Sequence, residues 1–318
     1  MGYAINNDDL TAYIINESQN VFSKKEQRYI QTTRLNKLII LVSKDLEQNG
    51  VIIEDFVWGY YRHGFYSSTV EDYLKTSFGA DFNLSQLTQE QVNLPEEVTQ
   101  MINNCLLKLS QYFVRDRKAF FEWIYGEITP NEYRDFYLTN RELNNWFEEI
   151  KDDLMGGNLQ MNLFGRKDRN ISGIISNYYF SLEHIEDEDI LEIFRKFTDL
   201  IEFLSIKLNN NQSISQITIK VDSLFRIYKD IFAILTPYIE TLHGDRKLVE
   251  QEKIKHKNRV QFYKKKLNKD LDELHEQFES EGLIPTINEL NKELLTLIKQ
   301  LPADSPTIRE LYEEIEAR

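Results

Sequence analysis

The sequence predicts a mainly α-helical fold, because helix-breaking residues are scarce and apolar residues recur at helical spacing over long stretches. The chain has 318 residues but only 12 glycines and 6 prolines. Its length suffices for two domains of ordinary size. We therefore predict a small helical N-terminal domain with a short β element. An antiparallel three-helix bundle or coiled-coil arm is expected to follow it.

Three ranges with different sequence character define the predicted organisation. Residues 1–154 have irregularly spaced, short helical patterns and are assigned to the N-terminal domain. Residues 155–184 contain several glycines and a basic patch, which are typical of a linker or long loop. Residues 185–318 carry sustained helical periodicity and are assigned to the arm, with two short helices at its end.

The best-defined elements of the N-terminal range are a helix, a β-rich segment and a second helix. An apolar stripe at 35–46 indicates the first helix, and Gly50 is well placed to end it. Residues 51–61 are rich in β-forming side chains. A serine at 67 or 68 is suited to cap the second helix.

The arm is predicted from apolar residues that alternate steps of three and four. One such stripe begins at Ile190, and a longer seam follows after a turn near 209–213. This seam comprises Ile217, Val221, Leu224, Tyr228, Ile231, Leu235, Tyr238 and Leu242. Pro237 is expected to kink its helix. A third helix of about 35 residues, spanning roughly 50 Å, is expected to end at Gly282.

Two short helices are predicted to close the chain. The Thr286–Glu289 sequence matches a capping box, in which side chain and backbone at a helix start bond reciprocally. The Ser305-Pro306 pair places a capping serine before a proline in the first helical position.

Charge and cysteine content limit the classes of function. The net charge is −14, which disfavours nucleic acid as a partner of the whole surface. The sequence contains no apolar run of about 18 residues, so no membrane span is expected. The N-terminus has no secretory signal pattern. Cys105 is the only cysteine, so no internal disulfide is predicted, and a reducing cytoplasm is the expected location.

No motif in the sequence predicts catalysis, a metal site or a cofactor. None of the five histidines lies three or four residues from another, and zinc and phosphate-loop signatures are absent. Cys105 lies within an apolar helical pattern and is predicted to be a core residue. We therefore expect a protein that is not an enzyme and needs no cofactor.

A basic run on the third long helix offers one candidate binding site. Its members are Lys253, Lys255, Lys257, Arg259, Lys264, Lys265, Lys266 and Lys269. Interleaved aromatic residues are compatible with a nucleic-acid surface. In an antiparallel three-helix arm, however, this half of the third helix would lie beside the acidic start of the first, at 186–192. Internal charge matching is therefore an alternative explanation, and the run could also set the register of a dimer.

An aromatic segment offers a second candidate site, for a protein partner. Its members are Trp58, Tyr60, Tyr61, Arg62, Phe65 and Tyr66. Aromatic rings at this density suit either a core strand and hairpin or the anchors of a protein interface. Both faces of so short a segment are not easily buried in a small domain, so we predict that the segment binds a partner.

The order of these elements resembles the Panacea domain, also called the SocA-like antitoxin domain. The family's Leu-x-Lys-Leu helix corresponds to residues 35–38. Its aromatic segment and turn correspond to Trp58, Tyr61 and Gly64, although Phe65 stands where the family has proline. The next helix begins near the serines that follow.

The resemblance covers about 33–78 and implies an antitoxin-like role. A domain of this kind binds and neutralises a partner protein, and such domains are common in mobile elements, prophages and defence loci. The first expectation is therefore a non-catalytic protein that binds a toxin or defence effector. Two alternatives remain: a nucleic-acid-binding regulator that uses 253–269, and a homo-oligomeric helical scaffold, for example a homodimer.

Overall fold

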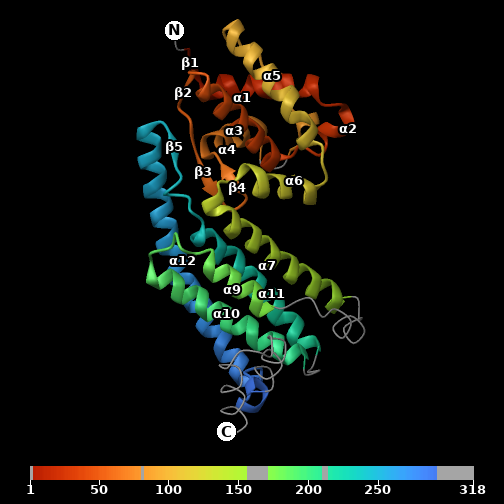
Figure 1. The fold of residues 1–318 in the computed structure, drawn as a ribbon, viewed down its shortest axis with the longest axis vertical. Helices are drawn as coiled ribbons and strands as arrows, with labels where there is room; N and C mark the ends of the chain where they lie inside the picture. Colours follow the sequence, from red (N-terminus) through yellow and green to blue (C-terminus); the bar gives the residue numbers. More distant parts are fainter. Residues whose placement is uncertain (1–2, 80–81, 156–170, 210–213, 292–318) are drawn as a thin grey trace, which may run out of the picture. The chain divides into compact units, whose positions relative to one another are not determined.

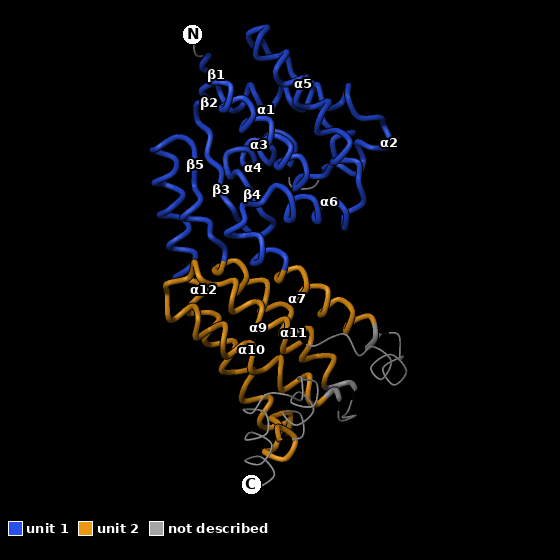
Figure 2. Tube along the Cα trace, in the orientation of Figure 1, with its two compact units in different colours: residues 1–138, 236–261 blue, residues 139–235, 262–318 orange. Residues whose placement is uncertain are grey.

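The computed structural model describes residues 3–79, 82–155, 171–209 and 214–291 and divides the chain into two compact units (Figures 1 and 2). Unit 1 contains residues 1–138 and 236–261, and unit 2 contains residues 139–235 and 262–318. The described chain is mainly α-helical, as predicted. None of its described helices has the length and apolar character that crossing a membrane requires.

The units divide the chain differently from the predicted ranges, because two long helices each contribute to both. Helix α7 (Asn131–Met155) begins in unit 1 and ends in unit 2, as does α12 (Arg246–Ser280). Residues 139–154 therefore belong with the C-terminal helices, and residues 236–261 belong with the N-terminal domain. Helical periodicity continues through such a boundary and gives no sign of it.

Unit 1 combines helices with two small sheets. Its first elements are β1 (Ala4–Asn6), α1 (Asn7–Val21), α2 (Lys24–Gln27), α3 (Thr32–Gln48), β2 (Ile52–Glu54), β3 (Val57–Tyr61) and β4 (Gly64–Tyr66). These are followed by α4 (Ser68–Phe78), a 3₁₀ turn (Leu84–Gln86), α5 (Glu96–Phe113), α6 (Arg117–Trp123) and a π-helical turn (Ile124–Ile128). Strands β1 and β2 pair in parallel, and the second sheet has the order β4-β3-β5, where β5 is His243–Gly244.

Helix α3 is the centre of unit 1 and follows the predicted apolar stripe. Leu35, Leu38, Val42 and Leu46 are fully buried, and the helix ends just before Gly50, whose φ is +83°. These burials confirm the stripe and its stop. Burying such side chains contributes roughly 1.5–3 kcal/mol each, so this helix anchors the elements packed around it.

Two buried polar side chains of α3 hold the β3–β4 hairpin. The side chain of Asn36 donates to the Ser67 carbonyl (2.8 Å) and accepts from the Ser67 amide (3.0 Å). The Lys37 ammonium donates to the carbonyls of His63 and Phe65, the latter at 2.9 Å. Ser67 in turn caps α4 by accepting from the Val70 amide at 3.2 Å. The predicted cap is thus confirmed at 67.

The segment after α11 returns to unit 1. Helix α11 (Ile214–Leu235) ends before Pro237, so the predicted proline kink is wrong. A residue preceding proline is disfavoured in helical conformation, and here the helix stops instead. The chain then forms β5 beside β3, and the Asp245 side chain caps α12 by accepting from the Lys247 amide at 2.9 Å.

Unit 2 is built from helices that lie side by side (Figure 1). They are the second part of α7, α9 (Ile171–Phe180), α10 (Glu188–Asn209), α11 and the second part of α12. Helix α9 lies in the range predicted to be a linker, which corrects that prediction. Its side chains at Ile171, Ile175 and Tyr178 are buried, so packing outweighs the loop-like composition around it.

Ion pairs define how the helices of unit 2 run. Lys264 of α12 contacts Asp187 at the start of α10 (2.9 Å), and Asp272 further along α12 contacts Lys196 (2.8 Å). Helices α10 and α12 therefore run in the same direction. Lys266 contacts Asp230, near the end of α11, at 2.6 Å. The expected charge matching between α12 and the acidic start of α10 is observed.

A lysine also fixes the segment that follows α12. The buried Lys207 ammonium lies 2.8 Å from the Glu289 carboxylate, which also accepts from the amide and hydroxyl of Thr286. These bonds hold the pKa of Glu289 at about 2, with the Lys207 bond the main cause. The predicted capping box at 286–289 is present. The closing helix predicted at 305–306 lies outside the described residues.

Candidate partner-binding surface

Three of the predicted partner-binding side chains are buried, which corrects that part of the prediction. Trp58, Tyr60 and Phe65 expose only 6%, 3% and 0% of their surface. The expectation that one face of β3 stays open was wrong. That face is covered from far along the chain, since the Trp58 ring lies against His243 with 4.9 Å between ring centroids. The Thr241 hydroxyl accepts from the Tyr60 amide at 2.8 Å.

The other three predicted side chains, Tyr61, Arg62 and Tyr66, remain partly exposed. The Tyr61 ring lies 5.6 Å from that of Tyr66 and 5.1 Å from that of Tyr238. Its backbone carbonyl accepts from the Tyr137 hydroxyl at 2.7 Å, which fixes the end of β3. These contacts present one edge of a tyrosine cluster to solvent on a rigid strand.

His256 forms the buried floor of this cluster. Its ring packs 5.1 Å from Tyr238 and, edge to face, 5.9 Å from Tyr61. Burial, aided by the positive charge of Arg259, lowers the pKa of His256 to about 4. The imidazole is therefore neutral at physiological pH, and its Nδ1 makes no hydrogen bond within the described part of the chain.

Two arginines flank the Tyr61 ring. The guanidinium carbon of Arg62 and that of Arg259 each lie 5.7 Å from the ring centroid, within cation–π range. The exposed Arg259 also donates to the Tyr61 hydroxyl at 3.1 Å. These two arginines come from the two sites that the sequence treated as alternatives, the aromatic segment and the basic run. We call Tyr61, Arg62 and Arg259 the tyrosine–arginine surface.

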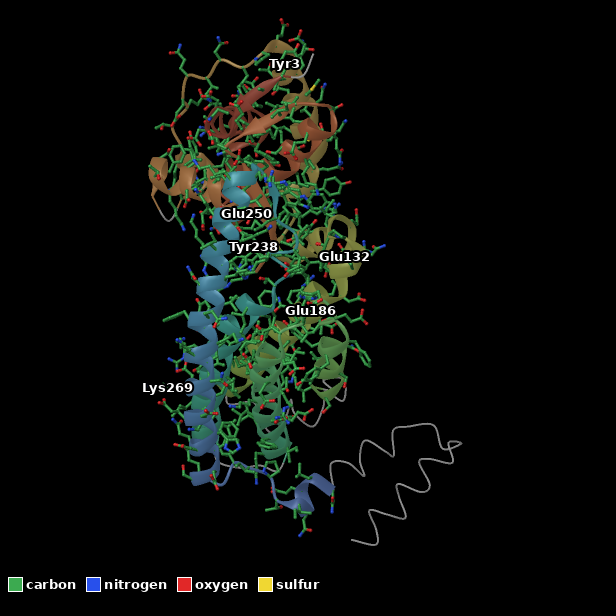
Figure 3. All side chains as sticks on the ribbon, turned by 90° about the vertical axis from the view of Figure 1, so that its left-hand side faces the viewer. Tyr3, Glu132, Glu186, Tyr238, Glu250 and Lys269 are labelled. Carbon is green, nitrogen blue, oxygen red and sulfur yellow. The ribbon has the colours of Figure 1, made fainter. Side chains whose placement is uncertain are left out.

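Two carboxylates next to this surface already have partners. Glu252 lies 2.8 Å from the Lys255 ammonium and also accepts from the Tyr238 hydroxyl. Glu71 lies 3.1 Å from Lys75 and accepts from the hydroxyl of Tyr66. Figure 3 shows Tyr238 beside the first part of α12. The charges of Glu252 and Glu71 are thus compensated before any ligand arrives, whereas the exposed Asp72, which acts on Tyr66, has no ion pair among the described residues.

Most of the predicted nucleic-acid site is engaged in ion pairs inside the protein. Five of its lysines have carboxylate partners: Lys253 with Glu250, Lys255 with Glu252, Lys264 with Asp187 and Asp189, Lys266 with Asp230, and Lys269 with Glu273. Lys257 and Lys265 are exposed and have no ion pair among the described residues. The positive field expected from the sequence is therefore strongly reduced.

Neither a metal-binding cluster nor a reactive thiol is found among the described residues. No group of three or more His, Cys, Asp or Glu side chains among them is arranged to hold a metal ion. Cys105 is buried, as predicted, and burial raises the pKa of its thiol to about 12. A protonated, enclosed thiol is a poor nucleophile.

Sequence reasoning missed the pairing of Tyr61 with Tyr238, His256 and Arg259. Tyr238 was placed in the heptad seam and Arg259 in the basic run, because both fit those local patterns. Arg259 and Tyr61 are 198 positions apart in the chain. A histidine with no other histidine nearby in the sequence does not indicate a site. Residues 236–261 return to unit 1, and this return places Tyr238, His256 and Arg259 beside Tyr61.

One protein family matches this chain, described as a domain of unknown function (DUF8098), over residues 67–297. The match covers well over half of the sequence. The chain belongs to this family. No curated protein and no solved structure matches it. The range shared with the DUF8098 family includes His256 and Arg259 but begins after Tyr61 and Arg62.

Proposed function

We propose that this member of the DUF8098 family is a non-catalytic recognition protein, antitoxin-like, which binds and neutralises a toxin or a defence or mobile-element effector protein. The resemblance of residues 33–78 to the Panacea domain supports this role. The proposed location is the cytoplasm, in keeping with the single cysteine, Cys105.

The observation that carries the proposal is the tyrosine–arginine surface. Tyrosine and arginine are enriched among residues that dominate protein-binding energy. Tyr61 is held by packing and by Arg259, so little side-chain entropy would be lost when a partner binds. Binding at this surface would neutralise the partner by covering its active or binding site, without any catalytic step.

A nucleic-acid-binding role through residues 253–269 has less support. Phosphate contacts require unpaired cations, and five of the eight cations in this run are paired within the protein. The net charge of −14 adds long-range repulsion toward a polyanion.

Affinity co-purification from a native-like host, treated with nuclease and followed by mass spectrometry, tests the proposal. The full chain should retain a stoichiometric protein partner. Tyr61→Ala should lower its recovery by about tenfold or more, because truncating an interface anchor typically costs that much affinity. Tyr29→Ala is the matched control, since Tyr29 is 58% exposed in the same unit.

Circular dichroism should confirm that both variants remain folded. Equal recovery with Tyr61→Ala and Tyr29→Ala would remove this surface from the interface. Loss of all bound protein on nuclease treatment would contradict the proposed function itself.

A further inference from the structure

Among the described residues, the two arginines of the tyrosine–arginine surface have no carboxylate partner. Neither Arg62 nor Arg259 has a carboxylate oxygen within 4.0 Å in the described part of the chain. Within the same part, the Nε of Arg62 is buried and makes no hydrogen bond. The protein has a net charge of −14, so two arginines that flank one ring and have no ion pair in the described part of the chain are a local exception to its acidic character. Arginines normally bind carboxylates or phosphates in such settings.

Positive charges also act on the turn between β3 and β4, at residues 62–63. The buried Lys37 side chain fixes this turn by donating to the carbonyls of His63 and Phe65. The positive charges of Arg62 and Arg117 both act on His63, which is part of this turn. An anionic group placed over this turn would therefore meet the charges of Arg62 and Arg117, while Glu71 and Glu252 nearby are already paired.

We propose that Tyr61, Arg62 and Arg259 form a docking surface for an acidic peptide segment of the protein partner. The two guanidinium groups bind side-chain carboxylates of the segment, and the Tyr61 ring packs against an apolar residue between them. This inference rests on the proposed function and specifies the chemistry of the partner.

The observations favour a peptide over a nucleic acid. A short acidic segment brings few charges and can be matched locally by two arginines. An extended phosphate backbone needs a continuous basic track, whereas Lys253 and Lys255, one to two turns before Arg259 on α12, are paired with Glu250 and Glu252.

Fluorescence polarisation with the full-length chain tests the inference. The probe is a short labelled peptide of alternating glutamate and glycine with one central leucine, and its counterpart has glutamine in place of glutamate. The acidic peptide should bind, and the glutamine peptide should bind at least about tenfold more weakly. Arg62→Gln and Arg259→Gln should each weaken binding of the acidic peptide by about tenfold or more.

Lys257→Gln provides the control, because Lys257 is exposed on the same helix two positions from Arg259 and should leave binding unchanged. Equal binding by Arg259→Gln and Lys257→Gln would overturn the inference. No binding of the acidic peptide, or tighter arginine-dependent binding of a labelled single-stranded oligonucleotide, would also overturn it.

The inference and the proposed function fail separately. A co-purified partner that is lost with Tyr61→Ala but retained with both arginine variants would keep the recognition role and reject the acidic segment. Arginine-dependent peptide binding in a chain that retains no protein partner would support the docking chemistry and reject the neutralising role.

Discussion

Gly244→Ala should destabilise unit 1 by about 3 kcal/mol or more, the sum of backbone strain and steric overlap. Gly244 has a φ of +116°, which side-chain-bearing residues rarely adopt. An added Cβ would also fall onto the carbonyl oxygen of Phe56 and lie 3.0 Å from the Cα of Val57. The pairing of β5 with β3, which covers Trp58, would have to separate.

Urea unfolding followed by circular dichroism measures this change, and Gly50→Ala is the matched control. Gly50 also has a positive φ, of +83°, but an added Cβ there meets no atom within 4 Å. Its expected cost is therefore only about 1 kcal/mol. If the two variants lost equal stability, β5 would not be held closely against β3.

Lys37 should make the stability of the protein rise with pH above neutrality. Burial lowers the pKa of its ammonium to about 7, against about 10.5 in an unfolded chain. Between these values the unfolded chain binds a proton that the folded chain does not, so the folded state gains up to about 1.4 kcal/mol per pH unit. The neutral amine keeps two N–H groups for the carbonyls of His63 and Phe65.

Lys37→Met removes this titration and leaves both carbonyls without their donor, at a cost of roughly 2–4 kcal/mol in alkaline solution. Urea unfolding of both proteins at several pH values between about 6 and 9 isolates the effect, because all other titrating groups are shared. The stability difference between them should widen as pH rises. Parallel stability curves would show that Lys37 stays charged in the folded protein.

Local patterns were sufficient to predict several elements of the fold. The stripe of α3, its stop at Gly50, the cap at Ser67 and the 35-residue length of α12 all follow from spacing and capping chemistry. Helix α9 was not predicted, because Gly173 and the glycines before it resemble a loop. The burial of its apolar side chains stabilises a helix that its own sequence does not favour.

The candidate surface was only half predictable for a different reason. Tyr61, Arg62 and Tyr66 stand out by composition, but so do Trp58, Tyr60 and Phe65, which are core. Which rings are exposed depends on the residues 236–245 that cover β3 from far along the chain. The pairing of β5 with β3 cannot be recognised in a single sequence. The contact of Arg259 with Tyr61 could not be predicted for the same reason.

The most direct test of partner recognition is site-specific photo-crosslinking in the native-like host. A photoreactive phenylalanine analogue replaces His63, which is exposed next to Arg62, and a control carries it at Leu107, which is 62% exposed on α5 of the same unit. Recognition through the tyrosine–arginine surface predicts one protein adduct from position 63 that is absent from position 107 and lost with Tyr61→Ala. Identical adducts from both positions, or none from position 63, would contradict it.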